Sequence, residues 1–363
     1  MTEDTALIEK REELKRQLAA GKYKTLFDVM LDGTGRLIQK LTRNPEPPSF
    51  WYSAVVVALV ALLIDFLVSI LLGEFNPLRR ETVPADLAVA GLILATVIAV
   101  KIGHNISFTA LREDLLDAIE SVADVTDLQH LLATLYNVKK PLSFGLAFGI
   151  FVGVYLPIVY ATIRAGFAGF GPTILTAILG FVGGVSLYYF PLLLALAGRL
   201  SRYQFNLYTA DPSSSEIISR LSGMLSSMVN MFAVLAAIYT LIFVVFGLLV
   251  AASIVFLALL VWGPLVAFFA ANQIALGKII TRAKWRTLNE IQAQVERVRT
   301  QEDIPSEKTL EHLGKLMDYH DRIKATRNSA LDLRTVLKFL NSLLLPLLAF
   351  LLANLDKIFA LFS

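Results

Sequence analysis

Long apolar runs alternate with charged segments along the chain. Six of these runs contain almost no charge, and each can cross a hydrocarbon core of about 30 Å as a helix that rises about 1.5 Å per residue. They are Phe50–Leu72, Asp86–Gly103, Pro141–Ile163, Pro172–Gly198, Val229–Leu249 and Ser253–Leu276. The pattern therefore predicts an all-α, polytopic integral membrane helix bundle with six spans in three hairpins.

A seventh apolar run, Val336–Leu355, has Pro346 in its middle. This run either crosses the membrane or lies half-immersed in one leaflet. Residues 343–353 are apolar on every side, which an interfacial helix does not need. We therefore favour a C-terminal membrane helix within residues 333–363.

Lys and Arg residues are distributed very unevenly between the loops. If the N-terminus lies inside, nearly all of them fall in the inner segments, and only Arg79, Arg80 and Arg164 fall in the outer loops. Cytoplasmic segments of membrane proteins are enriched in Lys and Arg. The distribution therefore predicts a protein of the cell membrane (the inner or plasma membrane) with a cytoplasmic N-terminus and short outer loops.

The predicted spans divide the chain into polar segments and membrane hairpins. The hairpins are residues 50–103, 141–198 and 229–277, and the second is rich in glycine. We expect amphipathic helices in 1–49, an acidic loop of two short amphipathic helices in 104–140, a linker with a helix in 199–228 and a helical hairpin in 278–332. All four polar segments fall on the same side of the membrane, so they are expected to form a cytoplasmic helical domain.

Two polar segments each allow two interpretations. Tyr23–Thr42 mixes apolar and basic residues, so it either lies flat on the inner leaflet or packs against the cytoplasmic domain. The hairpin in 278–332 either closes on itself, which we favour, or forms a stalk for self-association or partner binding. Its predicted apolar stripes are Leu288, Ile291, Val295 and Val298 on the first arm, and Leu310, Leu313, Met317 and His320 on the second.

Composition narrows the class of protein. Apolar residues make up 56% of the 363 residues and charged residues 17%, and the net charge of +3 does not indicate nucleic-acid binding. The absence of cysteine excludes disulfides and thiolate metal sites. No phosphate loop, dinucleotide fingerprint, nucleophile elbow or zinc-binding helix occurs, and the four histidines are scattered. We therefore expect no enzyme activity, no cofactor and no metal.

Glycines at four-residue spacing mark the second hairpin. Gly145, Gly149 and Gly153 share one face of its first helix, and Thr176, Gly180 and Gly184 share one face of its second. Small residues at this spacing let helix backbones approach closely in a membrane. We predict that the two faces pack together, with Gly153 near Gly180 and Gly149 near Gly184. The alternative is a subunit interface or a pore lining.

Asp65 is the one carboxylate deep inside a clear span, and an intramembrane charge is by default a candidate functional residue. Lys101 is its nearest candidate partner in sequence. Lys101 falls at the opposite end of its own span, however, so a direct pair is not expected. Gly263 and Pro264 are predicted to kink the sixth span and are candidate hinge residues.

These features favour a homo-oligomeric channel whose cytoplasmic helices act as a gate or sensor. The alternative is a membrane scaffold or accessory subunit that binds a partner through those helices. A transporter is less favoured, because only Asp65 lies near the midplane and no internal repeat is evident. The uncharged turn Val250–Ser253 favours an oligomer. The expected partners are the lipid bilayer and either further copies of the chain or another protein.

Overall fold

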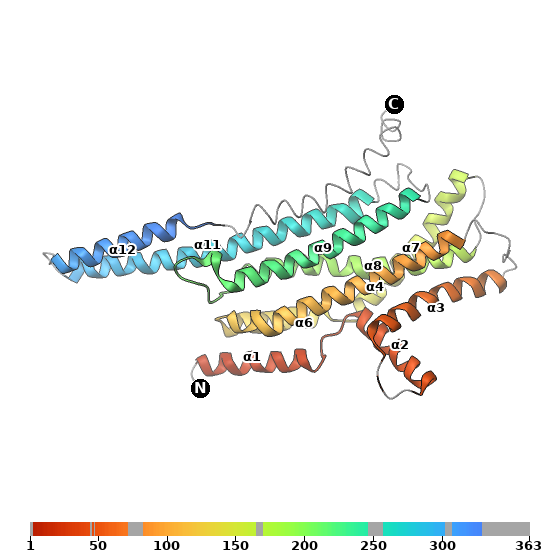
Figure 1. Ribbon diagram of the computed structural model, residues 1–363, viewed down its shortest axis with the longest axis horizontal. Coiled ribbons are helices and arrows are strands. Elements are labelled where there is room, and N and C mark those ends of the chain that lie inside the picture. The colour runs from red at the N-terminus through yellow and green to blue at the C-terminus, as the bar shows by residue number, and fades with distance from the viewer. Residues whose placement is uncertain are drawn as a thin grey trace, which may run out of the picture.

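The computed structural model describes residues 3–43, 46, 48–71, 83–164, 170–245, 257–301 and 307–328. Most of these residues are helical, and turns or loops join the helices, with one isolated β-bridge between Ile119 and Phe205 (Figure 1). The predicted C-terminal membrane helix and the turn Val250–Ser253 lie outside the described residues.

The helices follow one another along the chain with short connections. They are α1 (Glu3–Ala19), α2 (Leu26–Thr42), α3 (Phe50–Leu71), α4 (Val83–Ala110), η1 (Leu111–Leu115), α5 (Leu116–Ala118), α6 (Val122–Leu135), α7 (Lys139–Arg164), α8 (Phe170–Leu200), η2 (Pro212–Ser214), α9 (Glu216–Val245), η3 (Leu257–Trp262), α11 (Gly263–Gln301) and α12 (Glu307–Ala325).

Five helical segments in the described residues are long and apolar enough to cross a membrane: Phe50–Leu71, Asp86–Ala118, Ile174–Leu200, Glu216–Leu241 and Leu257–Thr300. These segments are compatible with a membrane location. The third predicted span falls on α7, whose side chains are described only as far as Val154. Six spans therefore stay a prediction.

Several helices run without a break from the apolar part of the bundle into the polar part. α4 continues through the π-helical turn η1 into α5, so the predicted separate helix at the start of 104–140 is wrong. α9 already begins at Glu216, and α11 extends to Gln301. The end of an apolar run does not end a helix unless a breaker or a cap follows. After α4 the apolar face continues through the buried Leu111 and Leu115 of η1.

The polar segments pack into a core of their own. Leu14 and Leu18 of α1 are buried in this core, and α1 contacts α5 and α6. The segment after α8 and the start of α9 contribute further apolar side chains to the same core. Ion pairs join segments that are distant in sequence, such as Lys15 with Asp117 at 2.7 Å and Arg286 with Glu120 at 2.6 Å. Exposed pairs of this kind add little stability, so the buried leucines hold this part together.

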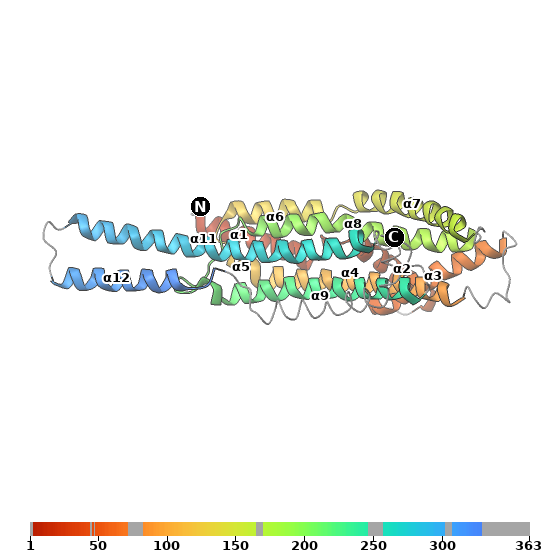
Figure 2. The same ribbon diagram turned by 90° about the horizontal axis from the view of Figure 1, so that it is seen from above.

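The hairpin of α11 and α12 extends beyond the other helices at one end of the molecule (Figures 1 and 2). Its small core contains Leu288, Ile291 and Ile323, with Leu316 and Tyr319 packed against it. The predicted stripe on the second arm is therefore wrong in part: Leu310 is 57% exposed and Met317 is 45% exposed. α12 has enough apolar positions for two stripes, and packing on α11 selects the one that contains Leu316, Tyr319 and Ile323.

Candidate functional site

The helix α2 is fixed by local signals and then docks on the bundle. The Thr25 hydroxyl accepts a hydrogen bond from the backbone N–H of Asp28 at 3.0 Å, and the Thr25 N–H donates to Asp28 Oδ2 at 2.9 Å. This reciprocal capping box starts the helix at Leu26. The N–H of Leu26 in turn donates to the hydroxyl of Tyr189 on α8 at 3.1 Å.

α2 packs against the apolar helices of the bundle, and not against the core of the polar segments as one of the two interpretations expected; its contact with the inner leaflet stays a prediction. Leu26, Phe27 and Leu31 are buried in the bundle core with residues of α3, α4 and α8. On the remaining face Leu37 and Leu41 are exposed. α2 lies oblique to the long helices (Figure 1). One face therefore packs on the protein, and the other is available to a membrane surface.

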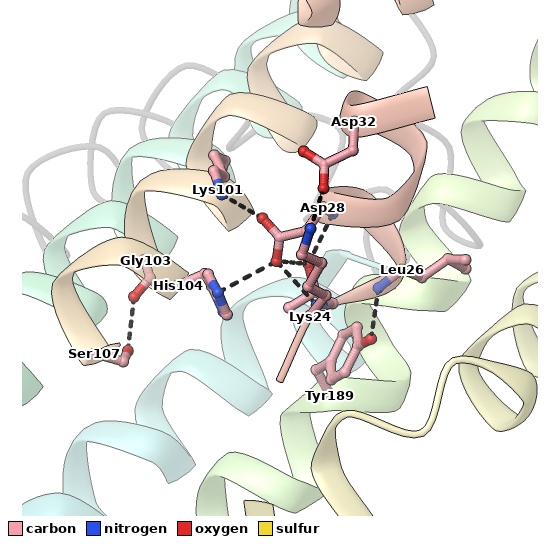
Figure 3. Close-up of polar contacts among 10 residues, drawn as sticks. Lys24, Leu26, Asp28, Asp32, Lys101, Gly103, His104, Ser107 and Tyr189 are labelled. Carbon is pink, nitrogen blue, oxygen red and sulfur yellow. Dashed lines mark hydrogen bonds and ion pairs between the residues drawn. The ribbon is translucent and has the colours of Figure 1, made fainter. Parts of the chain in front are cut away.

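A buried ionic cluster lies where α2 meets α4. Asp28 is 3% exposed. Lys101 Nζ donates to Asp28 Oδ1 at 2.5 Å, and His104 Nε2 lies 3.3 Å from Asp28 Oδ2 (Figure 3). The Thr25 hydroxyl also donates to Oδ2, at 2.6 Å. Each carboxylate oxygen of Asp28 is thus held by a side chain of α4.

Nearby charge and burial have opposite effects on the pKa of the Asp28 carboxyl. Burial alone would raise the pKa of the Asp28 carboxyl, but His104, Lys101 and the Thr25 hydroxyl outweigh it and hold that pKa below its usual value. His104 packs against the rings of Phe108 and Tyr136, at centroid distances of 4.2 and 5.4 Å. Its Nδ1 is buried and has no hydrogen-bond partner among the described residues. The Asp28 side chain is therefore a carboxylate anion in this cluster, and removing the Lys101 ammonium would lower the stability of the fold.

Sequence reasoning missed this cluster. The sequence suggests only Asp65 as a partner for Lys101, whereas the structure pairs Lys101 with Asp28, 73 residues away in sequence. Two local signals were present. Thr25 and Asp28 have capping-box spacing, and Lys101 and His104 are three apart, so they share one face of an otherwise apolar helix.

Asp65 lies in α3, is 7% exposed, and its Oδ1 has no hydrogen-bond partner among the described residues. With Asp86 of α4 it lines a groove of about 540 Å³ between the two helices. The expectation that Lys101 does not pair with Asp65 agrees with the observed Lys101–Asp28 pair.

The predicted glycine faces lie at the contact between α7 and α8. A Cβ on Gly149 would lie 2.8 Å from the carbonyl oxygen of Ala177, and a Cβ on Gly180 would lie 2.7 Å from Cβ of Val152. Gly145 faces Val185 and Phe181, and Gly184 faces Phe148. The space beside these four glycines is filled by the opposite helix, which favours helix packing over a pore lining.

The register of this contact differs from the predicted one. The residue nearest Gly180 is Val152, which precedes Gly153, and the residue nearest Gly184 is Phe148, which precedes Gly149, so the contact is shifted by about one residue toward the start of α7. The prediction assumed equal depths across the turn, whereas the fit of Phe148 and Phe181 beside the glycines decides the register. Gly153 is buried and Thr176 is half-buried.

Several buried polar side chains of α4, α9, η3 and α11 lie inside the apolar part of the bundle. Trp262 Nε1 donates to the Thr240 hydroxyl at 3.1 Å, and the hydroxyls of Thr96 and Tyr239 are 3.2 Å apart. Asn272 is 1% exposed, yet neither atom of its amide has a hydrogen-bond partner among the described residues. Most buried amides are paired, so water or a group outside these residues is the expected partner of this one.

The candidate hinge directly follows Trp262 in the chain. Gly263 and Pro264 begin α11 directly after the π-helical turn η3. A Cβ on Gly263 would lie 3.0 Å from the carbonyl oxygen of Ala258. π-helical turns and proline both interrupt the regular hydrogen-bond ladder, so the helix is locally weakened here. Movement about this point stays a prediction.

Comparisons of the chain with protein-family models, curated proteins and solved structures found no match. The described residues also contain no group of three or more His, Asp or Glu side chains placed to hold a metal ion.

Proposed function

We propose that the protein is a homo-oligomeric channel of the cell membrane, with its N-terminus and polar helices in the cytoplasm, where they act as gate or sensor. The buried amide of Asn272, which has no hydrogen-bond partner among the described residues, carries this proposal. A protein that only anchors a partner has no need of such a group among its apolar helices. Leaving a buried polar group unpaired costs about 1–3 kcal/mol, and a hydrated path beside α11 would satisfy the amide.

The cluster at Asp28 supports the gating part of the proposal. It ties α2, which has a face open to the membrane surface, to α4 in the centre of the bundle. A buried ion pair is weak evidence for stability, and registry or switching is its best-attested use. A change in how α2 lies on the membrane would therefore be transmitted to α4.

Replacing Asn272 tests the conducting function. Purified protein in planar bilayers is expected to give discrete current steps, and Asn272→Leu is expected to lower their amplitude by about tenfold or more, because an apolar side chain dewets the path. Asn230→Leu is the matched control, since Asn230 of α9 is exposed. Absence of current from the wild-type protein, or unchanged current in Asn272→Leu, would contradict the proposal.

The second candidate function is a membrane scaffold, and the exposed face of α12 favours it. Leu310 and Met317 lie on the projecting hairpin without a partner among the described residues, and Trp285 of α11 is 58% exposed. Exposed apolar surface of this kind is typical of a protein–protein contact.

The double variant Leu310→Ser, Met317→Ser tests whether α12 holds copies of the chain together. If the hairpin holds copies together, the mass of the purified complex in mild detergent is expected to fall to that of one chain, while the unfolding temperature changes by less than about 2 °C. The control is Asp318→Ala on the same helix, where an exposed charged residue is removed. A wild-type protein that is already monomeric would favour the scaffold and count against the channel.

A further inference from the structure

The groove between α3 and α4 has the size and lining of a small-molecule site. Its volume of about 540 Å³ lies within the range of ligand pockets, about 300–1,000 Å³. The lining is apolar except for Asp65 and Asp86, and Leu59, Leu63 and Leu87 are each more than half exposed on its walls. An apolar groove with a few polar groups fixes the orientation of a ligand through those groups.

Asp65 is the group in this groove that lacks a partner. It is 7% exposed, it lines the groove, and its Oδ1 has no hydrogen-bond partner among the described residues. It lies six residues before the end of α3 at Leu71, which is about 9 Å along the helix. A carboxylate at this depth is costly unless a cation or a donor reaches it.

Asp86 has an ordinary role that Asp65 lacks. It lies in the first turn of α4, where the helix dipole favours a negative side chain. Asp86 therefore adds negative charge to the groove at its outer end without requiring a ligand. Asp65 lies in the last third of its helix, away from the N-terminus, where the dipole gives no such compensation.

We propose that this groove binds a lipophilic monoamine, with the ammonium group on Asp65 and the apolar body along Leu59, Leu63 and Leu87. Charge complementarity selects a cation, and the apolar walls select one that carries its own apolar body. A bare Ca²⁺ ion takes six to eight oxygen ligands, whereas two carboxylates are the acidic groups of this lining. The site does not depend on whether the protein conducts.

The test is binding of monodansylcadaverine, a fluorescent primary amine, to the full chain in nanodiscs of phosphatidylcholine. Saturable binding with a blue-shifted emission is expected for the wild-type protein. Asp65→Asn is expected to weaken binding at least about 30-fold, because the ammonium then lacks its buried counter-ion. Asp86→Asn is expected to weaken binding by about threefold, since that charge lies farther from the ammonium.

Two controls separate ligand binding from folding and from partition into lipid. Asp318→Asn removes a charge from the exposed face of α12 and is expected to leave the affinity unchanged. The dansyl probe with an alcohol in place of the amine is expected to bind wild type and Asp65→Asn equally and weakly. Equal amine binding to wild type and to a folded Asp65→Asn would overturn the proposal. Displacement of the probe by phosphatidylethanolamine in the nanodisc would support the amine site and identify a lipid as the source of the ammonium group, whereas the lack of displacement would assign the site to a free amine.

Discussion

Lys101→Met is expected to lower the free energy of unfolding by about 3–5 kcal/mol. The substitution leaves Asp28, which is 3% exposed, as a buried anion that has lost its closest cation, the Lys101 ammonium at 2.5 Å. Methionine keeps much of the length of lysine, so packing changes little. The free energy of unfolding is measured in mild detergent, with circular dichroism as the signal that reports the loss of helix.

The exposed pair of Lys24 and Asp32 supplies a matched control for this prediction. Its N–O distance is also 2.5 Å, but both side chains are nearly half exposed. Lys24→Met is expected to cost no more than about 1 kcal/mol. Adding Asp28→Asn to Lys101→Met is expected to recover most of the lost stability, because the buried charge is then removed. If Lys101→Met lowers the free energy of unfolding no more than Lys24→Met does, the Asp28 cluster contributes no more to stability than an exposed ion pair.

Gly149→Ala is expected to destabilise the contact between α7 and α8 by about 1–3 kcal/mol. The added methyl group would lie 2.8 Å from the carbonyl oxygen of Ala177 and 3.0 Å from the backbone nitrogen of Phe181. Both are main-chain atoms of a helix, so they cannot turn aside as a side chain can. The two helices would have to separate, which the same unfolding measurement detects.

Gly183→Ala is the control for this effect and is expected to change stability in the opposite direction. Gly183 lies in α8 as Gly180 does, but a Cβ there meets nothing within 4 Å. Alanine is favoured over glycine inside a helix by about 1 kcal/mol, so this variant is expected to be slightly more stable. Equal destabilisation by both variants would mean that glycine acts through backbone flexibility rather than close approach.

The apolar runs predicted where the long apolar helices lie, because a membrane span needs a continuous apolar segment whatever its partners are. They did not predict where α4, α9 and α11 begin or end, because these helices continue into polar sequence. The glycine spacing likewise predicted the contact between α7 and α8. The exact register depended on how Phe148 and Phe181 fit beside Gly184 and Gly149, and no spacing rule contains that information.

The cluster at Asp28 could not be predicted from spacing in the same way. Its formation depends on the direction in which α2 crosses the bundle, which is set by contacts of Phe27 and Leu31 with α3, α4 and α8. α12 shows the same limit. Leu313, Leu316 and Met317 permit more than one apolar face, and only packing against Leu288 and Ile291 of α11 selects between them.

The unbroken course of α11 has a mechanical consequence. From Gly263 to Gln301 it is one helix of 39 residues, about 58 Å long. It is a stiff lever with one arm among apolar helices and the other joined to α12. A tilt of about 5° around its centre would move either tip by about 2.5 Å. A load applied at α12 would thus produce torque directly beside Asn272, without a flexible joint to absorb it.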